Sequence, residues 1–545
     1  MAFYLVQGKG NSIMERNFKQ LSGESIDVLV IGGGIYGAWT AYDAALRGLN
    51  TVLVDKGDWG SGTSMASSKL IHGGLRYLEQ MKFGLVKKAL AERKLLAELG
   101  PHRVLPLQLA VPLFRGSRVG PRQMKLGLIL YDWLAGHGQP VDSHRFLGRS
   151  RFTGAYPFIN NTNIRAGFTY GDCQTDDARL VLELVSGARK AGAVAVNYAS
   201  AESLLYEGDT VTGAVIKDGV DGASINIQAK VTINCAGPWN ESLLKDPDGP
   251  PLTRLNKGVH LLMPPLPTSH AFLIINESDN RIFFMIPWYG KTLLGTTDTD
   301  YPGDPDKVSV TREDIDYLLA GANRVFDSIT WDRSDVCGAF AGLRSLRNIE
   351  GASPSEVTRE WSLNDSQPGL LMPIGGKLTS ARADSQLIVD RACELLGAIP
   401  NEPHPTQVTP FPWSPDIEYE LWKSQMLEEA VDLGLPAEMA IWTIFRYGQK
   451  IHKIFNLIRT SPELSRPILK GLPFCQAELV YCATHEMVVH LRDLVRRRIP
   501  LIILQQLGRE SLKAIADKVA PILGWNEKDI EAEVEDIITH YAHIS

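Results

Sequence analysis

Three glycines and an aspartate near the start of the chain have the spacing of a dinucleotide-binding site. Gly32, Gly34 and Gly37 fit the pattern G-x-G-x-x-G, and Asp55 lies eighteen residues beyond Gly37. The first glycine of this pattern makes a tight turn, the second lets a pyrophosphate approach the backbone, and the third lets helix and strand pack closely. The acid accepts hydrogen bonds from an adenosine ribose. The motif predicts a bound dinucleotide but leaves open whether it is NAD or FAD.

Two later segments have compositions suited to contact with the same ligand. Residues 60–69 are mostly small or hydroxylated and could wrap a flat polar ligand, although a solvated loop is the alternative. Residues 72–77 add a histidine, two glycines, an arginine and a tyrosine. Residues 375–380 (GGKLTS) lie between a predicted strand and a predicted helix. This second strand–glycine–helix unit favours FAD, because FAD has two polar parts, its pyrophosphate and the pyrimidine edge of its ring.

A parallel sheet covered by helices is needed to position these residues. Short apolar runs at 26–31 and 51–54 predict two buried strands, and residues 35–47 between them predict a helix whose alanines can pack tightly on a sheet. The same patterns predict a strand that returns to this sheet and an antiparallel region beyond it. The further elements expected are helices at 83–99, 176–191 and 381–396, strands at 229–236 and 370–374, and alternating strands and turns at 255–300.

The length of 545 residues exceeds one hydrophobic core, so two or three domains are expected. We predict an α/β (α+β) fold with a discontinuous Rossmann-like FAD-binding domain, an antiparallel-sheet substrate domain and a helical C-terminal domain. Residues 397–415 hold six prolines and are expected to form no regular helix or strand. The expected boundaries are 25–100, 170–240 and 335–400 for the FAD-binding domain, 101–169 and 241–334 for the substrate domain, 401–415 for a proline-rich linker, and 416–545 for the helical domain.

The composition excludes several classes of protein. A net charge of −6 indicates no basic surface for nucleic acid. Six scattered cysteines without a C-x-x-C pair indicate neither a disulfide framework nor a zinc site, and we expect no metal. No apolar run approaches the roughly 18 residues needed to cross a bilayer. We therefore expect a cytoplasmic protein, or one attached to a membrane only at its surface.

Two basic segments are candidates for such peripheral membrane contact. Residues 122–134 are apolar and aromatic with a basic start, and Arg496–Arg498 lie between two apolar stretches. Anionic lipid attracts basic residues of this kind. For residues 122–134 the alternative is a place in the core, and for Arg496–Arg498 it is the basic end of an ordinary helix.

Several stretches occur in the order found in one family of flavoenzymes. They are DVLVIGGGIYGA, SSKLIHGGLRYLE, DDARLVLE, NCAGPW, KGVH, IPW, GTTD, AGLRSL, TREWSL and GGKLT. On these stretches the chain resembles the FAD-dependent, aerobic glycerol-3-phosphate dehydrogenases, closely over residues 25–400 and more loosely beyond. The resemblance implies FAD extended across a discontinuous nucleotide domain, as in flavoenzymes of the D-amino-acid-oxidase type.

The resemblance also implies an activity, the oxidation of sn-glycerol 3-phosphate to dihydroxyacetone phosphate. A hydride would pass from substrate C2 to flavin N5, and the electrons would leave to a membrane quinone. A position on the cytoplasmic face of the inner membrane and a homodimer are further expectations. Two alternatives stay open. One is an oxidase of the same fold that uses oxygen and a different small hydroxy or amino acid. The other is an FAD- or nucleotide-binding protein without enzymatic activity.

The residues carried over by motif divide into catalytic and substrate-binding groups. Histidine titrates nearest neutral pH, so His260 is the first candidate for the base and His72 the alternative. Arginine binds phosphate oxygens in pairs, and a cation can stabilise a developing alkoxide. Each residue taken alone could equally have a structural role. The expected catalytic residues are His260, Arg344 and Lys377, and the expected substrate-binding residues are Arg76, Tyr77 and Arg359.

The expected FAD contacts come from both glycine units and from the segments between them. Val259, Ser345 and Ala381 depart from the residues usual in the family, which leaves the shape of the substrate pocket open. The expected cofactor-binding residues are Gly32, Gly34, Gly37, Asp55, Ser64, Ser67, Ser68, Lys69, His72, Gly73, Gly237, Gly376, Leu378 and Thr379.

Overall fold

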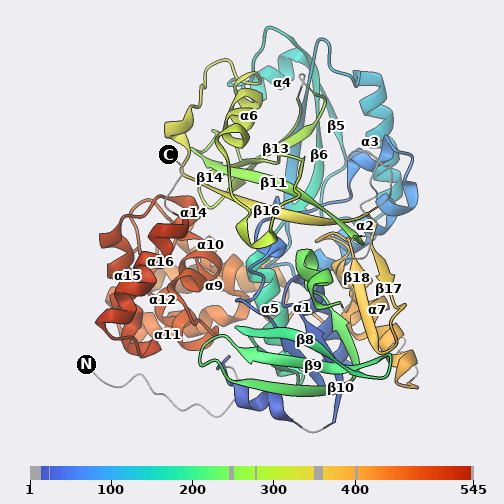
Figure 1. Ribbon diagram of the computed structural model, residues 1–545. Helices are drawn as coiled ribbons and strands as arrows, with labels where there is room; N and C mark the ends of the chain where they lie inside the picture. The colour runs from blue at the N-terminus through green and yellow to red at the C-terminus, as the bar shows by residue number, and fades with distance from the viewer. Residues whose placement is uncertain are drawn as a thin grey trace.

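Two β-sheets and a group of helices make up the chain, as Figure 1 shows. The computed structural model describes residues 14–23, 25–244, 251–276, 279–348, 360–398 and 403–541. The two sheets lie one above the other in Figure 1, and the helices of the C-terminal part lie beside both. The predicted α/β (α+β) fold with a helical C-terminal part is confirmed.

The lower sheet in Figure 1 is the predicted nucleotide-binding sheet. Its central strand β1 (Ile26–Ile31) is apolar except at Asp27 near its start, because both faces of its remaining length are buried. Val28 and Val30 pack against helices, whereas Leu29 and Ile31 pack against two outer strands. The strand order is β17 (Ser362–Asn364), β18 (Leu370–Ile374), β10 (Ser224–Asn234), β1, β2 (Thr51–Val54) and β7 (Val194–Val196), with β8 (Ala199–Glu207) and β9 (Thr210–Asp218) joined to β10.

Parallel pairing brings distant segments together in this sheet. Strand β1 pairs in parallel with β2 and with β10, and β10 pairs in parallel with β18, so the predicted returns of the chain at 229–236 and 370–374 are confirmed. Helix α1 (Ile35–Leu46) packs beside α5 (Asp177–Lys190) and α7 (Ala381–Leu395). Its alanines at positions 38, 41 and 44 have no exposed surface, which explains why this helix needs small residues.

The upper sheet is largely antiparallel, as predicted, except that β4 and β12 pair in parallel. Strands β6 and β16 belong to it although the expected boundaries place 170–240 and 335–400 in the FAD-binding domain, so these strands link the two regions. The boundaries themselves stay a prediction. The order is β15 (Thr299–Asp300), β11 (Thr253–Met263), β14 (Lys291–Gly295), β13 (Ile282–Trp288), β12 (Ala271–Ile275), β4 (Leu105–Phe114), β6 (Ile164–Gln174) and β3 (Leu70–Ile71), with β16 (Gly338–Arg347) on β11 and β5 (Arg145–Gly148) on β6.

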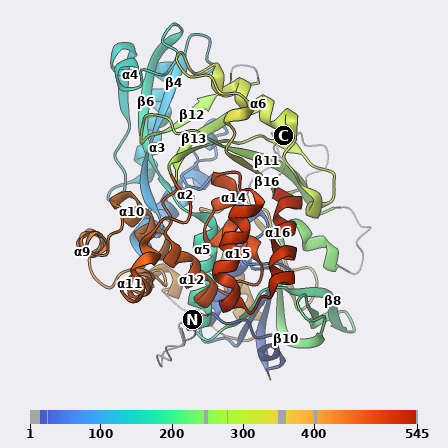
Figure 2. The same ribbon diagram turned by 90° about the vertical axis from the view of Figure 1, so that its left-hand side faces the viewer.

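The C-terminal helices share one hydrophobic core with the upper sheet. Figure 2 shows α14, α15 and α16 running alongside both sheets rather than standing apart. The helices of this part are α9 (Tyr419–Asp432), α10 (Ala437–Tyr447), α11 (Ile451–Thr460), α12 (Gln476–His485), α13 (Leu491–Asp493), α14 (Leu501–Leu504), α15 (Arg509–Leu523) and α16 (Glu527–Tyr541). The other helices are α2 (Phe83–Leu99), α3 (Pro121–Ala135), α4 (Arg149–Ala155), α6 (Arg312–Asn323) and α8 (Pro405–Val408).

Two expectations about the C-terminal part are wrong. The proline-rich segment contains the short helix α8, and its Phe411 is buried edge-on against Trp39 at 5.6 Å, so the segment is packed rather than a free linker. Residues 399–402 of it lie outside the described residues. The side chains of Arg496–Arg498 are buried, which excludes the lipid contact considered for them, and the Asp58 carboxylate, distant in sequence, binds Arg497 and Arg498. Among the described residues no helix is long and apolar enough to cross a bilayer.

Candidate functional site

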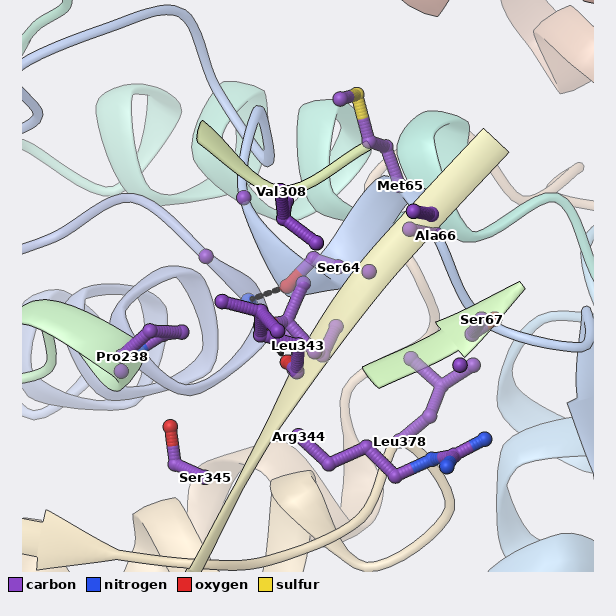
Figure 3. Close-up of a pocket in the computed structure, with 18 of the residues that line it drawn as sticks. Ser64, Met65, Ala66, Ser67, Pro238, Val308, Leu343, Arg344, Ser345 and Leu378 are labelled. Atoms are coloured by element: carbon purple, nitrogen blue, oxygen red, sulfur yellow. Dashed lines mark hydrogen bonds between the residues drawn. The ribbon is translucent and has the colours of Figure 1, made fainter. Parts of the chain in front are cut away.

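A cavity of about 1020 Å³ lies between the two sheets. Both predicted glycine turns, the segment 61–68 and strands β11 and β16 line it. Figure 3 shows part of this cavity, with Ser64 and Leu343 near the centre of the view and Arg344 and Leu378 below them. Most of the residues expected to bind cofactor or substrate therefore share one space: those that line it are Gly32, Gly34, Asp55, Ser64, Ser67, Ser68, His72, Arg76, Tyr77, Gly237, His260, Arg344, Gly376, Lys377, Leu378 and Thr379.

The first turn leaves the N-terminus of α1 facing the cavity. Gly32 has φ +100°, and a Cβ there would lie 2.6 Å from the Cys235 carbonyl oxygen. Gly34 forms the N-cap and has no side chain of its own with which to cap the helix. The Ile35 N–H donates to Ser64 Oγ at 2.8 Å. Backbone N–H groups and the helix dipole here favour an anion such as a pyrophosphate.

Asp55 is held in place by the backbone at the end of β2. Its carboxylate accepts hydrogen bonds from the N–H groups of Gly33 (2.6 Å) and Gly57 (2.8 Å). Burial raises the pKa of Asp55 to about 6 in spite of these bonds. A carboxylate that also lines the cavity can accept further hydrogen bonds, because it has about four lone-pair sites.

The second glycine turn meets the first through Tyr36 of α1. The Tyr36 hydroxyl donates to Asp384 at 2.6 Å and accepts from the Lys377 N–H at 3.2 Å. Gly376 has φ +107°, and a Cβ there would lie 1.9 Å from the Tyr36 hydroxyl oxygen. The His72 N–H donates to Thr379 Oγ1 at 3.1 Å. The two turns therefore converge on one cavity although they are more than three hundred residues apart.

His260 is buried on β11 with its ring fixed on two sides. Phe340 is its cross-strand partner on β16, and the two rings stack with centroids 5.1 Å apart and planes 20° from parallel. Nε2 lies 2.8 Å from Ser68 Oγ, and Nδ1 has no hydrogen-bond partner among the described residues. Burial, together with the charges of Arg344 and Lys69, lowers the pKa of His260 well below its usual value. The ring is therefore neutral at pH 7.

Two predicted cations lie in the same cavity in different settings. Arg344 donates to Asn256 Oδ1 at 2.8 Å and to Thr296 Oγ1 at 3.1 Å, and its distance to the Asp298 carboxylate is 3.3 Å. It leaves β16 in the direction opposite to Ser345 (Figure 3). The Lys377 ammonium lies 3.8 Å from the ring centroid of Tyr77, a cation–π contact.

Three expected site residues are described by the structure but do not line the cavity. Lys69 forms a buried ion pair with Asp177 and donates to the Met65 carbonyl at 2.9 Å. Gly73 packs against Leu90, where a Cβ would lie 2.3 Å away. Gly37 packs on the Gly32 carbonyl, the close approach that its motif predicts, and Arg359 lies outside the described residues.

Comparison with known proteins supports this geometry. A family model described as FAD dependent oxidoreductase matches residues 27–382, and one described as the C-terminal domain of alpha-glycerophosphate oxidase matches residues 394–530. A glycerol-3-phosphate dehydrogenase of Synechocystis is 35% identical, with 95% of this chain and 97% of that protein covered. An aerobic glycerol-3-phosphate dehydrogenase of Staphylococcus epidermidis is 32% identical, with 95% of each chain covered.

The chain belongs to the FAD-dependent glycerol-3-phosphate dehydrogenase family. A solved structure of the Bacillus halodurans glycerol-3-phosphate dehydrogenase complexed with FAD has a TM-score of 0.77 at 30% identity and covers 96% of this chain and 95% of that chain. An L-alpha-glycerophosphate oxidase from Mycoplasma pneumoniae, at 18% identity and a TM-score of 0.56, shares the fold. The cofactor is FAD, and the prediction of FAD over NAD is confirmed.

The residues present fit FAD. Asp55 and Ser200 line the same cavity as His260 and Arg344. Glycines stand where a side chain would fill the approach to the backbone, as at Gly376. Gly34 at the N-terminus of α1 also lines the cavity, and this helix end suits the pyrophosphate of such a ligand.

Sequence analysis missed three residues that build this family's site. Tyr36 joins the two turns, Phe340 supports the His260 ring, and Asp177 binds Lys69 and Ser67. Asp177 was visible in the sequence only as an acid suited to a helix N-terminus. Phe340 could have been found from the pairing of β11 with β16, which places it opposite His260, but that register is not readable from either strand alone.

Proposed function

We propose that this protein oxidises sn-glycerol 3-phosphate to dihydroxyacetone phosphate and passes the electrons to a membrane quinone. The observation that carries the proposal is a neutral, buried histidine beside two cations in the cavity that contains both glycine turns. FAD, when bound, supplies an acceptor for the hydride that leaves substrate C2. Side chains of the protein itself perform the other steps, proton removal and substrate binding.

His260 is the proposed base for the substrate hydroxyl. We assign this role to Nε2, because its neighbour Ser68 Oγ lines the cavity and a bound alcohol could replace it there, whereas Nδ1 is fully buried. A neutral imidazole can accept a proton, and the lowered pKa keeps it neutral below the usual titration range of histidine. Stacking on Phe340 fixes the plane of the ring and therefore the direction of its nitrogens.

The proposed role of the cations is to bind and polarise an anionic substrate. The Arg344 guanidinium is fixed by Asn256 and Thr296, so it is preorganised to stabilise a developing alkoxide or a phosphate oxygen. Lys377 lies over the Tyr77 ring and adds a second positive charge to the cavity wall. Arg76 also lines the cavity, and the phosphate-binding role of Arg359 stays a prediction from the resemblance.

Anaerobic reduction of the bound flavin tests the proposed substrate. We expect sn-glycerol 3-phosphate to bleach the absorption of purified holoprotein, and glycerol and glycerate phosphates to bleach it far more slowly. Glycerol lacks the phosphate. The glycerate phosphates carry a carboxylate, which changes the electron density at the remaining carbons. A yellow protein that glycerol 3-phosphate does not bleach would contradict the proposal.

The electron acceptor needs a separate assay. We expect a soluble quinone analogue to reoxidise the reduced protein many times faster than air, with little peroxide formed. Peroxide formed in proportion to substrate under air, with no gain from added quinone, would instead indicate an oxidase. The expected homodimer stays a prediction that sedimentation analysis can test.

Helix α3 offers the surface proposed for peripheral contact with the inner membrane. Leu126, Ile129 and Trp133 are exposed by 68%, 46% and 74%, and their spacing places them on one helix face. The opposite face packs into the core through Met124 and Leu128, so the helix is held with its apolar side outward. Exposed apolar side chains beside basic ones, here Arg122 and Lys125, are typical of interfacial helices.

Vesicle binding tests this surface. We expect the wild-type protein to cosediment with vesicles containing anionic lipid, and the variants Leu126→Gln and Trp133→Gln to cosediment less. Leu421→Gln on α9 is a matched control, because Leu421 is exposed by 53% on a different helix. Equal sedimentation of all these proteins would refute a role for α3.

A further inference from the structure

Three consecutive arginines of the helical domain are buried beside the FAD-binding region. They lie in one π-helical turn, Leu494–Arg498. Arg497 and Arg498 bind the Asp58 carboxylate, with Nε of Arg497 2.6 Å from Oδ2 and Nη2 of Arg498 2.9 Å from Oδ1. Asp58 follows the cavity residue Asp55 by three positions. These two arginines therefore fix the helical domain to the loop after β2.

Arg496 is directed elsewhere, to the wall of the main cavity. Its Nη2 donates to the Met65 carbonyl at 3.3 Å, and its guanidinium carbon lies 5.1 Å from the ring centroid of Phe340. Lys69 makes the same pair of contacts, with Nζ 2.9 Å from the Met65 carbonyl and 5.2 Å from the Phe340 centroid. Two cations from different parts of the chain thus hold one carbonyl and one ring.

Both groups that Arg496 contacts are connected to His260. Phe340 stacks on the His260 ring, and Met65 is three residues before Ser68, whose hydroxyl lies 2.8 Å from His260 Nε2. We infer that Arg496 is a positioning residue for the reaction: it holds the Phe340 ring and the Met65–Ser68 turn that together orient His260. This inference rests on the proposed function, in which His260 is the base.

The charge of Arg496 is compensated at longer range, by Asp177 and Asp176, and not by a directly paired carboxylate of the described residues. Arg497 and Arg498 are each paired with the Asp58 carboxylate, but within the described ranges no carboxylate lies within 4.0 Å of Arg496. Burial of an unpaired cation is costly, and burial is the main reason why the pKa of Arg496 is lowered. A leucine or methionine would fill this space at less cost. The retained guanidinium is explained by what it touches, an aromatic face and a carbonyl oxygen.

The experiment compares R496Q and R496K with wild type and with R509Q as a matched control. Arg509 belongs to the same helical domain but is half exposed and pairs with Glu531 and Glu535 on the surface. The first measurement needs no substrate: the rate at which diethyl pyrocarbonate modifies His260, followed by peptide mass spectrometry. The second is anaerobic flavin reduction by glycerol 3-phosphate in a stopped-flow instrument, with substrate affinity, FAD content and melting temperature measured in parallel.

In R496Q we expect the reagent to modify His260 at least about threefold faster than in wild type. We also expect flavin reduction to slow about tenfold or more, because small misplacements of a catalytic group have effects of this size. Substrate affinity should stay within about threefold of wild type, and R496K should recover part of the rate because it keeps the charge. R509Q should match wild type in both measurements. If R496Q melts far below wild type, the same two measurements on R496K are compared with wild type instead.

An unchanged reactivity of His260 in both variants would overturn the inference, whatever the flavin does. So would a slower reduction that follows only a loss of FAD. Wild-type protein that glycerol 3-phosphate fails to bleach would refute the proposed function instead. In that case a faster modification of His260 in R496Q would still show that Arg496 holds Phe340 and the Met65–Ser68 turn, the groups that orient His260.

Discussion

The variant Gly376→Ala tests whether the second glycine turn is built around Tyr36. Gly376 has φ +107°, a conformation that costs a residue with a Cβ about 1–3 kcal/mol. The added methyl group would lie 1.9 Å from the Tyr36 hydroxyl oxygen, so the phenol must move. That movement breaks the bonds from Tyr36 to Asp384 and from the Lys377 N–H to Tyr36, each worth about 1 kcal/mol.

The sum is about 3–5 kcal/mol, and its lower end corresponds to about 100-fold in an equilibrium constant. Because the turn must recover its native shape to face the cavity, we expect the cost to appear as weaker FAD binding. The assay is titration of apoprotein with FAD, followed by quenching of flavin fluorescence. We expect the dissociation constant of the variant to rise by about 100-fold.

A matched control separates backbone strain from the clash with Tyr36. Gly471 has φ +83°, and no atom lies within 4 Å of the Cβ position there. Gly471→Ala should lower the melting temperature slightly and leave FAD affinity unchanged. If Gly376→Ala binds FAD within about threefold of wild type, the turn does not contact the cofactor as we argue.

Three further predictions follow from the buried charges. His260→Asn should slow anaerobic flavin reduction about 100-fold and leave substrate affinity within about threefold, because it removes the base but little binding surface; stopped-flow reduction at several substrate concentrations measures both. Because the pKa of His260 is lowered, its ring stays neutral as the pH falls. The wild-type rate of flavin reduction should therefore stay constant below pH 6.5 and drop only near the lowered pKa. A fall in rate centred near pH 6.5 would contradict this prediction. Asp58→Asn removes the carboxylate shared by the buried Arg497 and Arg498, leaves Arg497 with Asp493, and should cost about 3–5 kcal/mol in thermal unfolding. Asp306→Asn, at an exposed ion pair, should cost under about 1 kcal/mol.

The sequence predicted those parts of the fold that depend on local pattern. The apolar run of β1, the glycines after it and the alanines of α1 follow from what a buried parallel strand and its helix require. The strand at 370–374 was also recognised, because the glycine turn after it repeats the same local signal. These features need no knowledge of distant residues.

The missed features all depend on partners far apart in the chain. Arg496–Arg498 look like the basic end of a helix until Asp58 is placed beside them, more than four hundred residues away. Lys69 has the sequence context of a cofactor contact but is neutralised by Asp177. Phe411 lies in a proline-rich segment, yet it is buried against Trp39. A charge or an aromatic ring acquires its role from its spatial neighbours, which one sequence does not reveal.

The distribution of charge around His260 explains how one site can favour an anionic substrate and still contain a base. Lys69 is compensated by Asp177, whereas Arg344 is 3.3 Å from Asp298 and fixed mainly by neutral groups. Burial, and after it the positive potential that remains nearby, lowers the pKa of His260, so the ring stays neutral and accepts a proton. The same potential attracts a phosphate ester. Removal of the Arg344 charge should therefore weaken substrate binding and raise the pKa of His260 together, and a variant Arg344→Gln that changes only one of the two would separate these roles.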